Sequence, residues 1–460
     1  MRTERDSLGE MDIGEEELHG IHTRRALENF GECGGPTKME LVRSVALVKK
    51  ACALAHGELG TLPGDVAGAI AAACDEVLEG RHDGAFRVAA LQGGAGTSTN
   101  MNVNEVLANL AAMRLGGKPG DYGRVHPLDH VNRGQSTNDV LPTALRIAAI
   151  GQVRRLAEAL AGLQESLQRK EREYAEVAKL GRTQLMDAAP IFLGQEFGAY
   201  AQAIARDRWR IYKAEERLRQ INLGGTAVGT GATAEKRFAF RATEILRELA
   251  GMGLARAEYP MDLTQNNDVF VEASGLLKAC AVNLLKISGD LRLMNSGPRG
   301  GLGEIRLEAR QVGSSIMPGK VNPVMAEHVG QCAMRVVAND AAIAMAAASG
   351  QLELNAFFPL IADSVLDSLG MLIHAAGRFR DHCVETLEAD AEACARHLNA
   401  STAPALLLVP LVGYDAAAEL AKESLRSGKS IRELAGERNL APDEELDRLM
   451  PRRPAGGEGR

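Results

Sequence analysis

The sequence is poor in aromatic residues, which make up 4% of its 460 residues and include a single tryptophan. Aromatic and β-branched side chains favour strands, whereas the alanine and leucine that are plentiful here favour helices. With 45% hydrophobic and 25% charged residues, the composition is that of a globular protein built mainly from helices. A chain of this length exceeds one simple core, so we expect two or three packed units.

Cysteine is scarce and irregularly spaced, with seven residues at 33, 52, 74, 280, 332, 383 and 394 and no CxxC pair. This pattern indicates reduced thiols, mostly in core positions, and a cytoplasmic protein. Long apolar runs are also lacking, since the longest, Ala403–Val412, is far shorter than the roughly 20 residues that span a bilayer. No apolar stretch follows the charged start Met1–Asp6, so we expect neither a signal peptide nor a membrane partner.

An excess of positive charge is absent, because 53 Lys and Arg stand against 60 Asp and Glu, for a net charge of −7. The chain therefore lacks the excess of positive charge that is typical of nucleic-acid-binding proteins. No HExxH or Cys/His grouping indicates a metal site, and residues 313–315 do not form a GxSxG elbow. The glycine-rich segments 92–98, 224–231 and 297–303 lack the GxxxxGK[ST] pattern and a preceding strand, so we predict no nucleotide or other cofactor.

Two long apolar stripes are present instead. Their members recur at steps of three and four residues, which draws one apolar face along a helix. The stripes are Val153, Leu156, Leu160, Leu163 and Leu167, and then Phe270, Ala273, Leu277, Cys280, Leu284, Ile287 and Leu291. We expect long bundled helices, some of which could face other subunits.

We divide the chain into three parts by sequence. These are an N-terminal domain over residues 1–135, a central helical bundle over 136–390, and a small C-terminal domain over 391–460. The proline- and glycine-rich tail at 451–457 is expected to be disordered.

Small hydroxyl and amide side chains crowd into four segments, at residues 96–105, 126–139, 181–190 and 313–323. Taken singly, each has a structural explanation. Thr97 or Ser98 and Ser136 or Thr137 could cap helices, with Glu105 and Asp139 as surface charges. His126 and His130 are likewise more often structural than catalytic. Taken together, the four clusters favour a site for a small dicarboxylate, which needs many neutral donors and one or two cations such as Lys320.

The fourth cluster, GSSIMPGKVNP at residues 313–323, resembles the signature of the aspartase/fumarase superfamily. The other three clusters occur in the order and context of that family, and the resemblance runs from Gly20-Ile21-His22-Thr23 to the C-terminal region. It implies an all-α fold in which a long central helical bundle is flanked by smaller N- and C-terminal helical domains. It also implies a homotetramer whose active sites are each shared between three subunits.

The resemblance also implies roles for individual residues. Ser314 is the general base that removes the Cβ proton of aspartate, and Lys320 with loop amides stabilises its alkoxide. Gly313 and Gly319 flank it as hinges of a loop that closes over substrate. The implied substrate contacts are Thr97, Ser136, Thr137 and Ser315 for the β-carboxylate, Thr183, Lys320 and Asn322 for the α-carboxylate, and Asn138 with Thr97 for the amino group.

Within the superfamily, the chain is more similar to the ammonia-lyases than to the fumarases. Fumarases have a histidine after the threonine of the third cluster, paired with a glutamate at the position of Glu327. In this chain Gln184, a substrate-binding candidate, takes the place of that histidine. Glutamine cannot titrate, and ammonia leaves without the acid assistance that hydroxide needs. Segments 93–102 and 135–139 point the same way, whereas Gly319 resembles the fumarases.

The activity implied is the reversible elimination of ammonia from L-aspartate to give fumarate. Fumarate hydratase is the first alternative, and a non-catalytic structural relative is the second. Met186 and Leu128 depart from the residues usual in both enzymes. Met186 could reshape the amino-group pocket, which leaves a modified aspartate open as the substrate.

Overall fold

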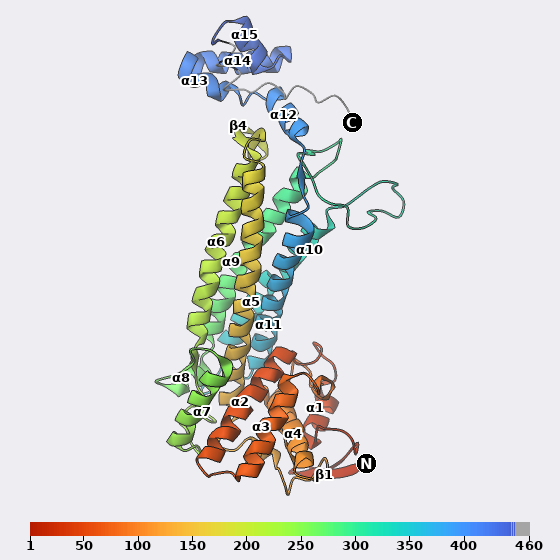
Figure 1. Cartoon of the computed structure of the whole chain (residues 1–460), viewed down its shortest axis with the longest axis vertical. Helices are drawn as coiled ribbons and strands as arrows, with labels where there is room; N and C mark the ends of the chain where they lie inside the picture. The colour runs from red at the N-terminus through yellow and green to blue at the C-terminus, as the bar shows by residue number, and fades with distance from the viewer. Residues whose placement is uncertain (443, 445, 447–460) are drawn as a thin grey trace. The chain divides into compact units, whose positions relative to one another are not determined.

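The computed structural model describes residues 1–442, 444 and 446, and most of them are helical (Figure 1). This confirms the predicted all-α class, while the tail predicted to be disordered lies outside the described residues. The helices are α1 (Ile21–Phe30), α2 (Met39–Glu58), α3 (Gly64–Leu78), α4 (Thr97–Arg114), α5 (Thr137–Glu173), α6 (Leu193–Leu218), α7 (Lys236–Ala250), α8 (Pro260–Gln265), α9 (Asp268–Met294), α10 (Val324–Ala348), α11 (Phe358–Phe379), α12 (Ala391–Ala400), α13 (Ala405–Val412), α14 (Tyr414–Ser427) and α15 (Ile431–Glu437).

The two apolar stripes predicted from the sequence form the buried faces of α5 and α9. The five stripe residues of α5 are at most 3% exposed, and the seven of α9 are at most 4% exposed. Burying a Val, Leu, Ile or Phe side chain contributes about 1.5–3 kcal/mol. The stripes therefore supply a large part of the free energy that holds the long helices together.

Short strands form four small two-stranded sheets among the described residues, none of which the sequence predicted. The antiparallel pairs are β1 (Arg2–Asp6) with β2 (Gly9–Ile13), β3 (Ala178–Thr183) with β4 (Met186–Phe192), and β7 (Ile305–Arg306) with β8 (Glu388–Ala389). β5 (Gln220–Ile221) pairs in parallel with β6 (Ala255–Arg256). The β3–β4 hairpin matters most, because it carries the third polar cluster.

By packing, the chain divides into two compact units. Unit 1 comprises Met1–Glu158, Arg208–Ala281 and Ala333–Ile373, and unit 2 comprises Ala159–Asp207, Val282–Cys332 and His374–Arg460. The long helices contribute segments to both units, so neither unit follows the order of the sequence. The predicted division near residues 135 and 390 is a partition by sequence rather than by packing, and it stays a prediction.

Each unit has its own local packing. In unit 1, α2 packs against α3, α4 and α7, and α1 packs against α4. In unit 2, α12 packs against β3, and α13 to α15 surround a small core. The buried members of that core include Leu408, Leu420, Ile431 and Leu434.

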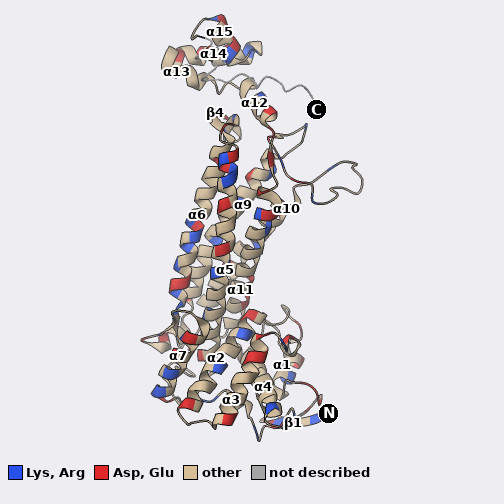
Figure 2. Ribbon diagram, in the orientation of Figure 1, with Lys and Arg blue, Asp and Glu red and all other residues tan. Residues whose placement is uncertain are grey.

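Charged residues of both signs lie along the helices (Figure 2), and the long apolar stretch Phe358–Val384 is mostly buried. Figure 2 shows Lys and Arg interleaved with Asp and Glu along the same helices. Among the described residues, one stretch, Phe358–Val384, is long and apolar enough to cross a membrane, but more than half of its most apolar window is buried inside the fold. All seven cysteines are free, and five of them are buried, as predicted for core thiols.

Candidate functional site

The second cluster begins α5 with a reciprocal cap. The Ser136 Oγ accepts the Asn138 backbone N–H at 3.2 Å, and the Asp139 carboxylate accepts the Ser136 backbone N–H at 3.0 Å. This satisfies amides that a helix N-terminus otherwise leaves unpaired. The capping interpretation of Ser136 is therefore correct, and the serine keeps its hydroxyl proton for a ligand. Asp139 as a surface charge is wrong, because its side chain is fully buried.

Asp139 also anchors the glycine-rich segment 224–231. Its second oxygen accepts the backbone N–H groups of Gly224 at 3.1 Å and Thr226 at 2.9 Å. Burial raises the pKa of Asp139 to about 6, although these amide donors act in the opposite direction. One carboxylate thus ties the start of α5 to a loop more than 80 residues away in sequence.

Asn138 is oriented by the same segment. Its Nδ2 donates to the Ala227 carbonyl at 2.7 Å, which leaves its Oδ1 as an acceptor for a cationic group. Pro142 lies inside α5 and has no N–H for the Asn138 carbonyl, and the Asn222 side chain donates to that carbonyl at 3.0 Å instead. The helix is therefore fastened to the loop at the position of the candidate residue.

The first cluster opens α4 next to the start of α5. Gly96 has a φ of 90°, and a Cβ there would lie 2.4 Å from the Leu141 side chain, so only glycine fits. The exposed Thr97 follows as the first helical residue, and its hydroxyl donates to the Gly94 carbonyl at 2.8 Å. In this arrangement the Thr97 oxygen is an acceptor, which suits an amino group better than a carboxylate.

The two clusters meet inside unit 1. The Asn100 side chain on α4 donates to the Thr137 Oγ1 at 3.2 Å. Glu105, also on α4, is 1% exposed and accepts backbone N–H groups from Gly20, His22 and Thr23 at the start of α1. An anion at that position is favoured by the helix dipole. The interpretation of Glu105 as a surface charge is therefore wrong.

The histidines of the second cluster have local structural roles. The His126 Nδ1 accepts the backbone N–H groups of Leu128 and Asp129 at 3.2 and 3.1 Å. The His130 Nδ1 accepts the His126 backbone N–H at 2.9 Å. Both rings therefore cap the short turn Pro127–Val131, the commoner role expected of them.

The third cluster lies at the tip of the β3–β4 hairpin in unit 2. Thr183 pairs with Met186, so Gln184 and Leu185 form the two-residue turn, with φ values of 53° and 64°. Positive φ at both positions is typical of the type I′ hairpin turn, and it is strained for residues other than glycine or asparagine. All four side chains are exposed, and Leu185 and Met186 are 72% and 70% exposed.

A buried ion cluster, which the sequence analysis missed, supports that hairpin. Glu304 is fully buried and pairs with Lys179 at 2.9 Å, Arg182 at 2.8 Å and His397 at 2.9 Å. Burial alone would raise the pKa of Glu304, but its cationic partners lower it below the usual value. Arg182 stands directly before Thr183, so the cluster fixes the strand that leads to the tip. Arg182 lies in the third polar cluster, but nothing in the sequence around Glu304 marks Glu304 as buried.

The fourth cluster surrounds Ser314 with amide donors. The Ser314 Oγ accepts the backbone N–H of Met317 at 2.9 Å and that of Ile316 at 3.2 Å. Two backbone donors that converge on one oxygen are an arrangement that favours negative charge on that oxygen. Lys320 is exposed, and its ammonium has no partner in the described part of the chain.

The ends of this loop are pinned to each other. The Asn322 Nδ2 donates to the Gly313 carbonyl at 2.7 Å. A Cβ on Gly313 would lie 2.1 Å from the Lys320 carbonyl oxygen, so the backbone entering the loop lies in contact with the backbone leaving it. Gly319 has a φ of 78°, and a Cβ added there would meet no described atom within 4 Å. The loop therefore has a closed neck and an exposed tip, where Ser315 and Ile316 face solvent.

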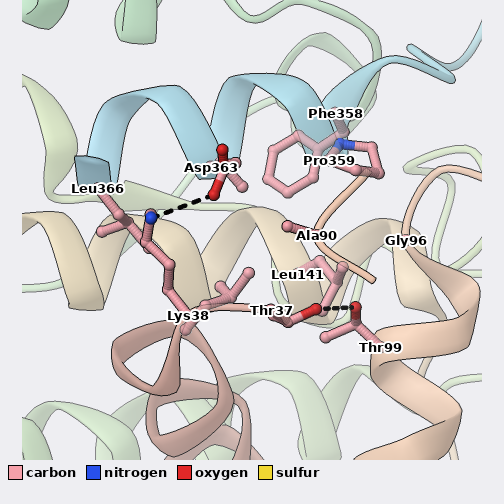
Figure 3. Close-up of a pocket in the computed structure, with 12 residues that line it drawn as sticks. Thr37, Lys38, Ala90, Gly96, Thr99, Leu141, Phe358, Pro359, Asp363 and Leu366 are labelled. Atoms are coloured by element: carbon pink, nitrogen blue, oxygen red, sulfur yellow. Dashed lines mark hydrogen bonds and ion pairs between the residues drawn. The ribbon is translucent and has the colours of Figure 1, made fainter. Parts of the chain in front are cut away.

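A large cavity lies beside the neck of the loop in unit 2. Its volume is about 1010 Å³, and it is lined by Arg292, Lys320, Asn322 and Glu327 among others. A second cavity, in unit 1, lies between the Thr37–Thr99 hydrogen bond and the Lys38–Asp363 ion pair (Figure 3). Its volume of about 20 Å³ holds roughly one water, so a dicarboxylate does not fit there.

The predicted site residues thus fall into two groups. Unit 1 holds Thr97, Ser136, Thr137 and Asn138, and unit 2 holds Thr183, Gln184, Ser314, Ser315, Lys320 and Asn322. In the part of the chain that the structure describes, no group of three or more His, Cys, Asp and Glu residues could hold a metal ion.

Comparison with known proteins gives concordant matches along the chain. A family model described as lyase matches residues 9–338, and one described as the fumarase C C-terminus matches 407–452. An aspartate ammonia-lyase of Bacillus sp is 44% identical over 98% of this chain and 96% of its own length. A structure described as fumarate lyase:delta crystallin from Brucella melitensis bound to cobalt has a TM-score of 0.94 and 46% sequence identity to this chain. A structure of a class II fumarase from Schistosoma mansoni has a TM-score of 0.92 and 34% sequence identity. Each comparison covers 98% of both chains.

Proposed function

We propose, because the chain belongs to the aspartase/fumarase superfamily of lyases, that it is an aspartate ammonia-lyase, a carbon–nitrogen lyase that reversibly converts L-aspartate into fumarate and ammonia. Identity of 44% to a curated aspartate ammonia-lyase over nearly the full length supports this over the 34% shared with a class II fumarase. The structural observation that carries the mechanism is the pair of amide donors on Ser314.

Ser314 is the general base in this proposal. Its alkoxide takes the Cβ proton of aspartate, and the electron pair of that bond moves into the β-carboxylate to give an aci-carboxylate dianion. The dianion then collapses to a Cα=Cβ double bond and expels the amino group from Cα as ammonia. A free serine hydroxyl is a weak acid, so the amides of Ile316 and Met317, together with the Lys320 ammonium, stabilise the alkoxide.

The remaining candidates hold the two carboxylates. Ser136, Thr137 and Ser315 contact the β-carboxylate, where negative charge grows in the transition state. Both unit 1 hydroxyls accept a hydrogen bond from the protein, so each keeps its proton to donate to that carboxylate. The α-carboxylate is held by Thr183, Lys320 and Asn322, which are two neutral donors and one cation.

The amino group is held by acceptors rather than by donors. The Asn138 Oδ1 and the Thr97 oxygen are both available, because the Asn138 amide and the Thr97 hydroxyl donate elsewhere. Gln184 adds an amide that does not titrate, and the departure of ammonia needs no acid at that position.

An assay with two substrates tests the proposal. The purified protein is incubated with L-aspartate or L-malate, and fumarate is followed by its ultraviolet absorbance. Fumarate from aspartate supports the proposal, while fumarate from malate alone would show a fumarate hydratase. No fumarate from either would favour a non-catalytic relative, against which the intact Ser314, Lys320 and Asn322 argue, or action on a modified aspartate.

A homotetramer with sites shared between three subunits is part of the proposal. The exposed apolar side chains support it, since Trp209, Val282, Met334 and Met345 are 51–67% exposed on long helices. Bundled helices with exposed apolar side chains can pack against the helices of other subunits. Seven free cysteines support a cytoplasmic location.

Subunit mixing tests whether the sites are shared. Thr137→Ala, in unit 1, and Ser314→Ala, in unit 2, are each expected to be nearly inactive. If one site takes these two residues from different subunits, mixed tetramers contain some sites with both intact. Activity should therefore return when the two variants are unfolded and refolded together, and not when each is refolded alone. A mixture that stays inactive, with tetramers seen by sedimentation, would show that both residues come from one chain.

A further inference from the structure

Lys49 is a buried lysine that the mechanism above does not use. It lies on α2 with no exposed surface, and its ammonium donates to the Asn132 Oδ1 at 2.7 Å. No carboxylate lies within ion-pair distance of it in the described part of the chain. A buried charge without a counter-ion is costly, so burial favours the neutral amine until an anion compensates the charge.

The Asn132 Oδ1 is a shared acceptor that connects this ammonium to the candidate substrate residues, because the ammonium and the side-chain amides of Asn100 and Asn104 all donate to it. The Asn132 Oδ1 also accepts the Asn100 Nδ2 at 3.2 Å, and the same Nδ2 donates to the Thr137 Oγ1 at 3.2 Å. Since Asn100 occupies a lone pair of the Thr137 oxygen, the threonine proton is directed elsewhere. Thr137 has no acceptor for that proton within the described residues, and its side chain is 9% exposed.

We propose that Lys49 is a positioning residue whose buried ammonium, acting through Asn132 and Asn100, orients the Thr137 hydroxyl toward the β-carboxylate and stabilises the charge that develops there. This role rests on the proposed function, because it needs a substrate that becomes a dianion at that carboxylate. Interactions that strengthen as charge develops raise kcat more than they lower KM.

The surroundings of Lys49 decide its protonation. Burial lowers the pKa of Lys49 to about 8, and the titratable groups that act on it are Cys52, Cys74 and Asp139. Burial raises the pKa of both thiols, to about 12 for Cys52, so they are neutral at physiological pH. Asp139 is the one charged neighbour among these, and backbone amides occupy both its oxygens. A bound dicarboxylate would therefore raise the pKa of Lys49.

The first test is a matched pair of variants on α2. Lys49→Met removes the buried ammonium, whereas the control Lys50→Met removes a neighbouring lysine that pairs with Asp75 at 2.6 Å. We expect Lys49→Met to lower kcat/KM by about 10- to 100-fold, less than the 100- to 1,000-fold of a donor touching the oxyanion. Most of the loss should fall on kcat, and Lys50→Met should match the wild type. Lys49→Arg, which keeps the charge, should recover part of the rate.

The second test uses the wild type, so it holds even if Lys49→Met does not fold. Succinate, a dicarboxylate that cannot eliminate ammonia, is titrated calorimetrically at pH 8 in buffers of different ionisation enthalpy. We expect uptake of about half a proton per site, since a group with a pKa near 8 is half protonated there. Affinity should hold below pH 8 and fall above it, as Lys49 loses its proton.

The outcomes separate the two proposals. A wild type that releases no fumarate from aspartate overturns both the function and the role of Lys49. An active wild type that binds succinate without proton uptake, or a folded Lys49→Met that matches Lys50→Met in kcat, overturns the role of Lys49 alone.

Discussion

The two groups of candidate residues are built in opposite ways. In unit 1, Ser136 and Thr137 stand at the start of α5, where caps, Asp139 and a docked loop hold them. In unit 2, Ser314 stands in a loop whose tip is exposed and whose ends are joined by the hydrogen bond from Asn322 to Gly313. Charge stabilisation requires preorganised donors on rigid elements, whereas a base that must let substrate in and out belongs on a mobile loop. The contrast matches the roles proposed for Ser136 and Thr137 on the one hand and for Ser314 on the other.

The largest effect that tests this contrast is expected from Ser314→Ala. We expect kcat to fall by at least about 1,000-fold, because base catalysis is lost with its stabilised alkoxide. Succinate affinity and the melting temperature should barely change, since the side chain lies in a loop outside the core. Ser349→Ala, whose hydroxyl is exposed and donates to the Met345 carbonyl, serves as the control. Near-normal turnover in Ser314→Ala would remove the serine as the base.

Asp139→Ala is expected to act on stability and activity together. It leaves the amides of Ser136, Gly224 and Thr226 without their buried acceptor, so we expect unfolding to become easier by about 3 kcal/mol. Activity should fall as well, because the start of α5 loses its anchor. Glu158→Ala, at an exposed position on α5, should change stability by less than about 0.5 kcal/mol. A variant as stable as the wild type, seen in urea unfolding, would contradict a rigid unit 1 group.

Glu304→Gln tests whether the exposed hairpin of unit 2 rests on a rigid base. It removes the charge that Lys179, Arg182 and His397 share, and we expect a loss of about 2 kcal/mol at pH 7. The folded pKa of Glu304 lies below its usual 4.5, so its stabilisation is present above that pH and is lost as pH falls through the folded value.

The pH dependence is the control built into this experiment. The difference in unfolding free energy between wild type and Glu304→Gln should therefore shrink in acid. Glu308→Gln breaks a partly exposed pair with Arg310 and should cost less than about 1 kcal/mol. A difference that stayed constant from pH 7 to pH 3 would mean that the charge of Glu304 contributes nothing.

Local sequence was sufficient for several parts of this protein. The period of the apolar residues predicted the buried faces of α5 and α9, because a helix turns every 3.6 residues whatever it packs against. Ser136 and Asp139, three residues apart, form the cap at the start of α5. The candidate site residues all lie in the four polar clusters. These are features of neighbouring residues, and neighbours in sequence are neighbours in space.

Tertiary structure decided the rest. Sequence context alone leaves Glu105 and Asp139 as surface charges, and only the fold buries them against amides from distant segments. The β3–β4 hairpin and the Glu304 cluster depend on partners far along the chain. Lys49 and Lys50 are adjacent residues of the same type, yet the fold buries Lys49 with its ammonium on Asn132, while Lys50 pairs with Asp75 near the surface. The sequence determined which groups this protein has, while burial, which arises only when remote segments pack, decided which of their charges have a function.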